Sequence, residues 1–397
     1  MPAQQSHLEL LLRGVDVVKP PEALAEKLAT GRPLRVKLGL DPTAPSVTLG
    51  WAVVLRKLRH FQELGHMAVL IVGDFTAQVG DPSGKSETRK RLSRDEVLGY
   101  AESVLSQFRK VLLPEPLEIR YNSEWLASFD MGEVLELTSK VTVAQMLERG
   151  DFAQRFEKNS PISVMEFMYP LLQGYDSVAV EADVELGGSD QLWNLMMGRV
   201  IQERYGMAPQ VAMTMPLLLG TDGVHKMSQS LGNYIGVDEA AEVIFGKTMS
   251  IPDELMTQWF LLAADTHPDE VAAISSRLTD GSAHPGVVKR DLARRLVALY
   301  WDDEAAVAAE EAFDLIHRRG EIPDDIPEYT LPPDPTISLP SLLRDAGLAA
   351  SAGEARRLIQ QGAVKLDGER LDTLEVERST LVGGALQVGK RRFARLV

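Results

Sequence analysis

The stretch from residue 35 to residue 72 constrains the fold most, because its hydrophobic pattern changes twice. Residues 35–40 form a short apolar run typical of a strand, and residues 41–46 are dense in turn formers. Helical spacing starts near residue 47, Gly65 stops it, and a second apolar run follows. The segment therefore predicts a strand–turn–helix–strand unit. The residues expected on one apolar helix face are Trp51, Val54, Leu58 and Phe61.

Such a unit offers a place for a ligand at the carboxyl end of its first strand. There the N-terminus of the following helix presents free N–H groups to an anion. An ordinary strand–helix–strand unit without a ligand explains this segment equally well. The choice between the two depends on the rest of the chain.

Composition narrows the class of protein. A chain of 397 residues suggests two or three domains, and the absence of cysteine excludes disulfides, Cys-ligated zinc and thiol catalysis. The N-terminus does not resemble a signal peptide and no apolar run approaches the ~20 residues of a membrane span, so we expect a cytoplasmic protein with no membrane partner.

Charge is unevenly distributed along the chain. The net charge of −15 argues against general nucleic-acid affinity. Residues 339–397 nevertheless contain ten Lys or Arg and seven Asp or Glu, which gives this end a charge of +3. A basic C-terminal segment on an otherwise acidic chain predicts a separate module with its own binding partner.

Short apolar runs alternate with helical patterns between residue 34 and about residue 235. The alternation predicts an α/β fold, a Rossmann-like and mostly parallel sheet with helices on both faces. The strand candidates are 35–40, 67–73, 117–121, 183–187 and 211–219. The predicted organisation is a helical lead-in (1–33), the α/β domain (34–239), an α-helical domain (240–320), an acidic proline-rich linker (321–338) and a small α+β module (339–397).

The loop after the second strand, residues 80–90, superficially resembles a phosphate-binding P-loop. The pattern GxxxxGK(S/T) needs glycine at its first position, and Val79 stands there instead. We therefore reject a P-loop. A polar loop that carries two cations, Lys85 and Arg89, remains, and an ordinary solvated loop is an open alternative.

Residues 165–177 place three polar groups on one helix face, since Tyr169, Gln173 and Asp176 are spaced by four and three. A phenol, an amide and a carboxylate among apolar neighbours need partners, and a ligand with an amino group and a hydroxyl would satisfy them. A closed internal polar network is the alternative. Pro170 should kink this helix or mark its first turn.

Two further loops follow strand candidates. Gly187 and Gly188 would allow close backbone approach to a ligand, and Asp190 could hold ribose hydroxyls. The glycine- and serine-rich segment 221–233 carries one lysine, Lys226, where a phosphate could pass. Taken alone, each loop is better explained as an ordinary connection between a strand and a helix.

Taken together and in order, these segments resemble the bacterial tyrosyl-tRNA synthetases of class I over nearly the whole chain. The shared motifs are VKLG before a DPT turn, a HIGH-type position at 48–51, a DPSGK-like loop, a Tyr-x-x-x-Gln-x-x-Asp helix, a GGxDQ turn and a KMSKS-type loop at 226–230. Residues 354–368 resemble a ribosomal-protein type of RNA-binding module.

The resemblance implies roles for individual residues. It places Asp176 on the tyrosine hydroxyl and Tyr169, Gln173 and Asp81 on the α-amino group. The implied tyrosine-binding residues are Lys37, Gly39, Asp81, Tyr169, Gln173, Asp176 and Gln191. The implied ATP-binding residues are Asp41, Gly50, Gly188, Asp190, Lys226, Met227 and Ser228. The implied catalytic residues are Thr43, Thr48, Trp51, Lys85, Arg89, Lys226 and Gln229. The implied RNA-binding residues are Arg356, Arg357 and Lys365.

The sequence departs from the family at two motifs. Thr48 and Trp51 replace the two histidines of the HIGH-type motif, and Gln229 replaces the second lysine of KMSKS. The Thr48 hydroxyl and the Trp51 indole N–H could substitute in part, although Trp51 could equally be a packing residue. Gln229 can donate a hydrogen bond but carries no charge.

The expected function is a tyrosine–tRNA ligase that uses ATP as substrate, with Mg²⁺ accompanying ATP and no metal-ligand set in the chain. The expected partners are tyrosine, ATP, tRNA(Tyr) and a second copy of the chain, whose contact surface would be residues 134–156. Two alternatives remain open: a catalytically impaired paralogue that binds tyrosine or RNA, and an adenylate-forming ligase for another amino acid. The trio Tyr169, Gln173 and Asp176 argues against the second.

Overall fold

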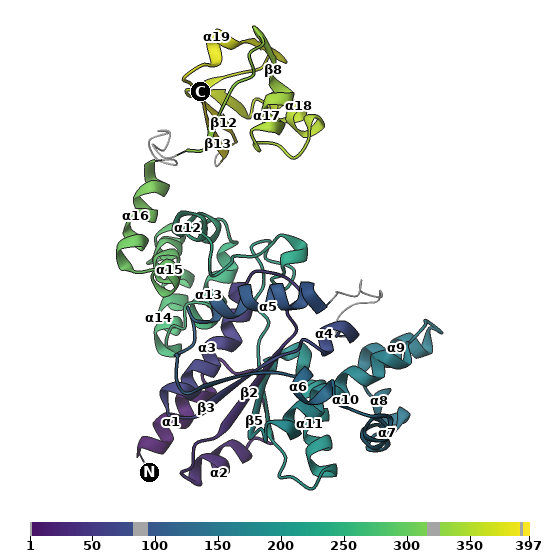
Figure 1. Cartoon of the computed structure of the whole chain (residues 1–397). Coiled ribbons are helices and arrows are strands. Elements are labelled where there is room, and N and C mark those ends of the chain that lie inside the picture. Colours follow the sequence, from purple (N-terminus) through teal and green to yellow (C-terminus); the bar gives the residue numbers. More distant parts are fainter. Residues whose placement is uncertain (1, 82–93, 316–325, 390–391) are drawn as a thin grey trace. The chain divides into compact units, whose positions relative to one another are not determined.

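The computed structural model describes residues 2–81, 94–315, 326–389 and 392–397 (Figure 1). It contains two compact units, Met1–Asp302 and Asp303–Val397, and each has a β-sheet of its own. The predicted boundary between residues 239 and 240 falls inside the first unit. The finer division of the chain into domains stays a prediction.

A six-stranded sheet organises the first unit, with the strand order β1-β6-β5-β2-β3-β4. Strands β2 to β6 are parallel, and most of their residues are buried, as expected for a sheet covered on both faces. The strands are β1 (Val17–Lys19), β2 (Arg35–Leu40), β3 (Met67–Val72), β4 (Leu117–Tyr121), β5 (Val184–Gly188) and β6 (Val211–Met215).

The sheet confirms the predicted Rossmann-like fold and adds one strand. All five strand candidates form strands, although the last ends at Met215 rather than at residue 219. The expected helical lead-in contains the additional strand β1, which pairs antiparallel with β6 at the edge of the sheet. The sequence did not predict β1 because a strand of three residues is too short to show a periodic pattern. Its pairing with β6 is a contact between segments far apart in the sequence.

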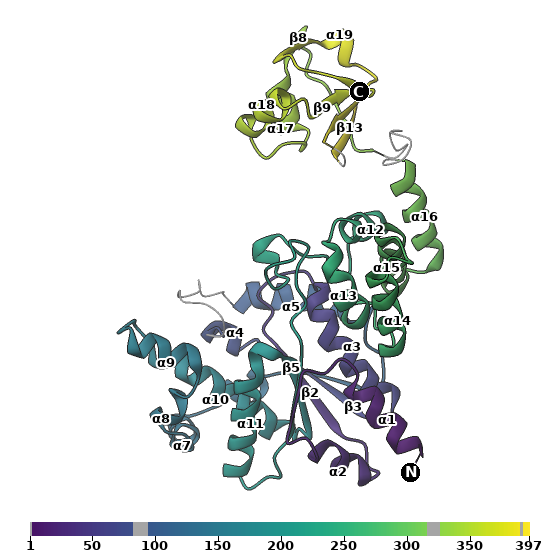
Figure 2. The same ribbon diagram turned by 180° about the vertical axis from the view of Figure 1, so that it is seen from behind.

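Helices cover both faces of the sheet. Helix α3 packs against β2, β3 and β5, while α11 packs against β5 and β6. In both views α1 and α3 lie on one side of the strands, and α10 and α11 lie on the other (Figures 1 and 2). The helices as far as residue 204 are α1 (Pro2–Leu12), α2 (Ala23–Ala29), α3 (Leu49–Glu63), α4 (Thr76–Val79), α5 (Arg94–Phe108), α6 (Ser123–Leu126), α7 (Met131–Ser139), α8 (Val143–Met146), α9 (Gly150–Glu157), α10 (Val164–Ala179) and α11 (Leu192–Arg204).

Helix α3 begins at Leu49, and Thr48 is its N-cap residue. The Thr48 hydroxyl accepts a hydrogen bond from the backbone N–H of Trp51, which satisfies one free donor of the first turn. Leu58 and Phe61 are fully buried as predicted. The prediction is wrong for Trp51, which lies in the first turn of α3 and is 39% exposed.

Helix α10 runs without interruption through Pro170. Ser163 and Glu166 form a capping box at its start, and Tyr169, Asp176 and Ser177 are among its buried residues. Pro170 therefore lies inside the helix rather than in its first turn. The helix supplies the polar face that the sequence predicted.

Residues 241–300 are helical and lead away from the sheet. Their helices are α12 (Ala241–Met249), α13 (Met256–Leu262), α14 (Pro268–Thr279) and α15 (Pro285–Tyr300). The described residues from 240 to 315 contain no strand, as predicted. Of the helices described in that range, α16 (Asp303–Asp314) belongs to the second unit.

The second unit contains a five-stranded sheet with the order β10-β9-β12-β13-β7 and a separate pair, β11 and β8. Its helices are α17 (Leu339–Asp345), α18 (Ala352–Gln360) and α19 (Arg378–Leu381) in addition to α16. Its strands are β7 (Glu328–Tyr329), β8 (Thr336–Ser338), β9 (Val364–Leu366), β10 (Glu369–Arg370), β11 (Glu375–Glu377), β12 (Ala385–Val388) and β13 (Arg392–Leu396).

The second half of the expected linker differs from the prediction. Strand β7 pairs with β13, and β8 pairs with β11, so residues 328–329 and 336–338 are integral to the module. Prolines lie between these short strands rather than inside them, which leaves their ladder hydrogen bonds intact. Among the described helices of both units, none has the length and apolar character to cross a membrane.

Candidate active site

The site residues gather where the order of the sheet reverses. The chain moves outward from β2 to β3 and β4, then returns to place β5 and β6 on the other side of β2. Ligands of open α/β sheets bind at the carboxyl ends of the strands that flank such a switch point, here β2 and β5. Asp41 directly follows β2, and Ser189, Asp190 and Gln191 directly follow β5.

Asp41 is the centre of one hydrogen-bond cluster. It accepts hydrogen bonds from the Thr76 hydroxyl (2.7 Å) and from the phenol of Tyr169 (2.9 Å). The pKa of Asp41 is raised to about 7, mainly by burial and also by the charges of Asp81 and Asp176, while the two hydrogen bonds oppose the shift. Gly73 makes room for this carboxylate, since a Cβ at that position would overlap it.

Asp176 is the centre of a second, deeper cluster, and only 3% of it is exposed. The Trp125 indole N–H donates to one carboxylate oxygen (2.9 Å), and the Asn122 amide donates to the other (3.3 Å). The same Asn122 amide also donates to the Thr76 hydroxyl, which links the two clusters. Burial raises the pKa of Asp176 to about 6, and the charge of Lys37 and these two donors oppose the shift.

Lys37 lies beside these clusters but binds protein groups. Its ammonium donates to the Gln173 carbonyl and the Ser177 hydroxyl, both at 2.8 Å, and pairs with Glu185 at 2.9 Å. The Gln173 side chain donates to the same Glu185 (3.0 Å). The structure thus gives the predicted tyrosine-binding groups of Lys37 and Gln173 partners within the protein.

A chain of amides connects Asp81 to the following helices. The Gln191 amide donates to Asp81 (2.9 Å), and Asn194 donates to Gln191 (2.9 Å). Arg149 in turn donates to Asn194 (3.3 Å). Asp81 and Gln191, both predicted to bind tyrosine, are therefore brought together by the fold.

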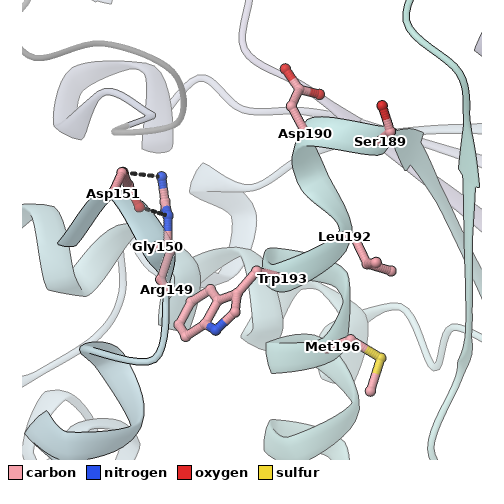
Figure 3. A pocket seen from close by; sticks show the side chains of 8 residues that line it. All are labelled: Arg149, Gly150, Asp151, Ser189, Asp190, Leu192, Trp193 and Met196. Carbon is pink, nitrogen blue, oxygen red and sulfur yellow. Dashed lines mark hydrogen bonds and ion pairs between the residues drawn. The ribbon is translucent and has the colours of Figure 1, made fainter. Parts of the chain in front are cut away.

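A groove of about 510 Å³ borders the turn after β5. Figure 3 shows the Arg149 guanidinium directed toward Asp151, with the Trp193 ring beside it. The guanidinium pairs with Asp151 at 2.7 Å, and its central carbon lies 5.9 Å from the centre of the Trp193 ring. The groove is open next to the predicted ribose-binding position. Its lining residues are Arg149, Gly150, Asp151, Ser189, Asp190, Leu192, Trp193 and Met196.

The segment 226–237 is attached to the turn that opens α3. The Gln229 amide donates to the Ser46 carbonyl (2.5 Å), and Leu49 N–H donates to the Ile235 carbonyl (2.9 Å). Met227 is buried and contacts Gly50, so that a Cβ on Gly50 would lie 3.5 Å from it. The two altered motifs of the sequence are thus in direct contact.

The same segment reaches the turn after β5. Lys226 pairs with Asp190 at 2.9 Å, and about half of the Lys226 side chain is exposed. Ser228 N–H donates to Asn233 (2.9 Å), and the hydroxyls of Ser228 and Ser230 are hydrogen-bonded. Lys226 is therefore a cation that a phosphate could recruit by displacing a partly exposed carboxylate.

Other predicted residues lie at the open side of the site. Gly39 is exposed, and a Cβ there would meet only open space. A Cβ on Gly188 would come within 2.8 Å of Asp190, so this glycine permits the turn. Thr43 is exposed. Within the described residues, the Trp51 indole N–H makes no hydrogen bond.

Some predictions fall elsewhere or outside the described part of the chain. Lys85 and Arg89 lie outside the described residues. Arg356, Arg357 and Lys365 are exposed on the second unit. Across the residues that the structure describes, no group of three or more His, Cys, Asp or Glu is arranged to hold a metal ion.

Sequence reasoning missed several residues that hold the site together: Thr76, Asn122, Trp125, Ser177, Glu185 and Asn194. Asn122 and Trp125 follow the end of β4, and Thr76 follows β3, so the rule that polar residues gather at the ends of parallel strands could have found them. Glu185 could have been suspected as a charge inside an apolar strand.

The arrangement offers distinct chemical capacities at its two ends. The buried carboxylates Asp176 and Asp41 can accept hydrogen bonds from a hydroxyl and an ammonium group. The exposed Lys226 and the N–H groups at the start of α3 can face anionic oxygens. Positioning of the reactants and stabilisation of developing charge are therefore what these groups can supply.

Comparison with known families agrees with this geometry. Residues 29–318 match the family model described as tRNA synthetases class I (W and Y), and residues 338–375 match the S4 domain model. The gap between the two matches falls on the segment 321–338 that the sequence predicts as a linker.

Curated relatives cover nearly the full chain. A tyrosine–tRNA ligase of Moorella thermoacetica is 54% identical over 98% of this chain and 95% of its own length. A tyrosine–tRNA ligase of Geobacter sulfurreducens is 50% identical over 98% of both chains. Among solved structures, the tyrosyl-tRNA synthetase of Archaeoglobus fulgidus in complex with L-tyrosine has a TM-score of 0.63 at 22% identity, covering 77% of this chain and 99% of its own. This last likeness concerns the fold.

Proposed function

This chain belongs to the class I tyrosyl-tRNA synthetases, and we propose that the site described above joins tyrosine to tRNA(Tyr) in two steps driven by ATP. In the first step the tyrosine carboxylate attacks the α-phosphorus of ATP, an O–P bond forms, and pyrophosphate leaves. In the second, a hydroxyl of the terminal ribose of the tRNA attacks the adenylate carbonyl, and AMP leaves.

The observation that carries the assignment of the amino-acid pocket is the position of Asp176. Its carboxylate is buried at the switch point, and the donors Trp125 and Asn122 fix both of its oxygens. A carboxylate held in this way can accept a hydrogen bond from the tyrosine hydroxyl. Phenylalanine would leave it without that partner, which supports selection of tyrosine.

The ammonium group of the substrate would lie among Asp41, Asp81, Tyr169 and Gln173. The Tyr169 phenol and the Gln191 amide orient Asp41 and Asp81, respectively. Because burial and neighbouring carboxylates raise the pKa of Asp41, an incoming ammonium group would restore its ionised form. We therefore propose that Asp41, which the family resemblance implies for ATP, also contributes to binding of the amino acid.

The nucleotide would occupy the side toward Asp190, Lys226 and the start of α3. Asp190 would hold the ribose, and the pairing of Lys226 with Asp190 supports their closeness to one ligand. Thr43, Lys85, Arg89 and Lys226 would contact the phosphates. Mg²⁺ would arrive with ATP, bound mainly by phosphate oxygens and water.

The departures at Thr48, Trp51 and Gln229 act on the first step. Thr48 uses its oxygen as the N-cap acceptor of α3, and Gln229 binds the Ser46 carbonyl. Neither adds charge to the phosphate end, so transition-state stabilisation there rests on Lys226 and on the loop cations. The Trp51 indole N–H, which has no partner among the described residues, can reach a ligand oxygen.

Tyrosine-dependent exchange of pyrophosphate into ATP tests this function. We expect exchange with tyrosine, and a higher rate when Thr48→His and Trp51→His restore both histidines. Binding of tyrosine without exchange would instead identify a catalytically impaired paralogue. Exchange with another amino acid in preference to tyrosine would remove the proposed role of Asp176.

The second unit would bind the outer structure of the tRNA, because it matches the S4 model and its end of the chain is basic. Arg356, Arg357 and Lys365 would make backbone and shape contacts there. Deleting residues 339–397 should spare pyrophosphate exchange and impair tRNA charging. Equal loss of both activities would contradict this division. A cytoplasmic location fits an enzyme that charges tRNA for translation.

We propose a homodimer that forms through the segment predicted at 134–156. Large apolar side chains are exposed in and around it, namely Met131, Leu135, Val143, Phe156 and Val164. Such a concentration is typical of a protein–protein interface. Leu135→Glu with Phe156→Glu should shift the mass measured by light scattering from dimer to monomer, whereas Val287→Glu, at an exposed apolar residue of α15, should leave it unchanged.

A further inference from the structure

We propose that the buried ion pair between Lys37 and Glu185 controls the ionisation of Asp176 and, through it, the selection of tyrosine over phenylalanine. The inference rests on the proposed function, in which Asp176 accepts the tyrosine hydroxyl. It assigns both members of the pair as positioning residues that do not contact the substrate.

The pair lies at the switch point of the sheet. Lys37 on β2 and Glu185 on β5 face each other in register, and they are 0% and 1% exposed. The Lys37 ammonium has three N–H groups, and its three partners are Glu185, the Gln173 carbonyl and the Ser177 hydroxyl. No donor is left for a ligand, so Lys37 acts through its charge and its contacts.

Glu185 is equally saturated. One carboxylate oxygen accepts from the Gln173 amide, and the other accepts from the Ser177 hydroxyl (3.2 Å) and the Gln210 amide. Gly198 on α11 leaves space for this arrangement, since a Cβ there would lie 3.0 Å from the Glu185 carboxylate. Side chains and backbone from β2, β5, α10 and α11 therefore converge on this pair.

The pair holds the turn of α10 that carries Asp176. Gln173 precedes Asp176 by three residues and Ser177 follows it directly, and both bind Lys37 and Glu185. Any movement of the pair is therefore transmitted to the segment on either side of Asp176.

The charges that face Asp176 come from three directions. Lys37 favours its carboxylate form, while Glu185 and, after β2, Asp41 oppose it. Tyr169 on α10 presents a neutral phenol that donates to Asp41. Trp125 and Asn122 add two donors. With a pKa of about 6, Asp176 changes its ionisation just below neutral pH, where a small change in these charges has a visible effect.

A buried ion pair is weak evidence for stability, because desolvation offsets much of its attraction. Its two members have opposite electrostatic effects on Asp176, and this separates an electrostatic role from a structural one. Loss of the Lys37 charge should raise the pKa of Asp176, and loss of the Glu185 charge should lower it. Disturbed packing alone would shift the pKa of Asp176 in the same direction in both variants.

The experiment measures kcat/KM for tyrosine and for phenylalanine in pyrophosphate exchange from about pH 5 to about pH 8.5. The ratio of the two cancels the titration of ATP and of groups that both amino acids share. For the native chain we expect the ratio to fall as pH decreases through about 6, where Asp176 becomes protonated. Lys37→Gln should move this midpoint up by about one pH unit, and Glu185→Gln should move it down by roughly half a unit.

The double variant Lys37→Gln/Glu185→Gln keeps hydrogen-bonding groups without either charge, so its midpoint should return close to the native value. If Lys37→Gln does not fold, two results still test the proposal. The midpoint should move down in Glu185→Gln, and it should return close to the native value in the double variant. Shifts in the same direction, or no shift in either single variant, would overturn the proposal.

Two controls complete the test. Lys289→Gln removes another buried lysine, which binds Asp253 and the Ile251 carbonyl in the helical region, and should leave the midpoint unchanged. Asp176→Asn tests the proposed function itself, since it should abolish the pH dependence of the ratio. If the pH dependence of the ratio survives in Asp176→Asn, the role of Asp176 is wrong; if Asp176→Asn abolishes the pH dependence while the pair variants shift nothing, only the role of the ion pair is wrong.

Discussion

The two ends of the active site are built in different ways. At the amino-acid end, Asp176, Lys37 and Glu185 are buried, and each has partners from several elements of the fold. At the proposed nucleotide end, Lys226 and Trp51 are substantially exposed, and the Gln229 amide joins the segment 226–237 to the turn before α3. The first end is preorganised by packing, whereas the second can respond to a ligand.

The contrast also separates what each end contributes. In the proposed assignment the buried end would supply discrimination between amino acids, because an unmatched polar group in it is costly. In the proposed assignment the exposed end would supply charge to the phosphates, and it is the end where this chain lacks both histidines and one lysine of the family motifs. Specificity and rate should therefore respond to different substitutions.

The largest effect is expected from Asp176→Ala. Without the buried acceptor, the preference for tyrosine over phenylalanine should fall by about 10⁴-fold, since sites of this kind discriminate to about that extent. The ratio of kcat/KM values in pyrophosphate exchange measures it. The KM for ATP serves as the control and should remain near that of the native chain; a comparable change in it would remove the distinction between the two ends.

Lys226→Met should come next. It removes the cation that pairs with Asp190 in the turn after β5, and loss of one such charge-stabilising group typically lowers kcat by about 10²–10³-fold. Tyrosine affinity, followed by equilibrium dialysis, should not change. A loss of tyrosine binding equal to the loss of rate would mean that Lys226 belongs to the amino-acid end.

Gln229→Lys should have a smaller effect of opposite sign. A charged donor forms hydrogen bonds stronger than a neutral one by about 1–1.5 kcal/mol, which corresponds to roughly tenfold in rate. Pyrophosphate exchange should therefore increase by up to this factor, and the gain should shrink at high salt. Gln229→Ala, which breaks the contact with Ser46 without adding charge, is the matched control and should not increase the rate.

The smallest effect concerns the cap of α3. Thr48→Ala removes the acceptor for the Trp51 N–H and should lower the free energy of unfolding by about 1 kcal/mol, whereas Thr48→Ser should retain most of it. Urea denaturation measures both. Equal stability of Thr48→Ala and the native chain would show that the hydroxyl is free for the nucleotide end.

Much of the catalytic fold could be predicted, because its strands are apolar runs with turn formers at their ends. The face of α10 that carries Tyr169, Gln173 and Asp176 follows from helical spacing alone. The gathering of Asp41, Asp81 and Gln191 was implied by family resemblance, and the structure brings them to one edge of the sheet.

The remaining features depend on contacts between distant segments. Asn122 and Trp125 reach Asp176 across more than 50 residues of sequence, so their position after a strand can suggest a site residue but not which carboxylate they bind. The partnership of Lys37 with Glu185 requires the register of β2 and β5. Trp51 follows the periodicity of an apolar face, yet it is exposed in the first turn of α3, and periodicity alone does not reveal which turns of a helix are covered.

Strand β1 has a consequence beyond topology. Residues 211–215 of β6 are all buried, and β1 pairs with the side of β6 that β5 leaves open. In a chain that lost residues 1–19, β6 would become an edge strand with mostly apolar side chains and unpaired backbone N–H and C=O groups. Such an edge can pair with another extended chain. By pairing with β6, the short strand β1 covers this edge. We expect that a variant without residues 1–19 would aggregate more readily than the native chain.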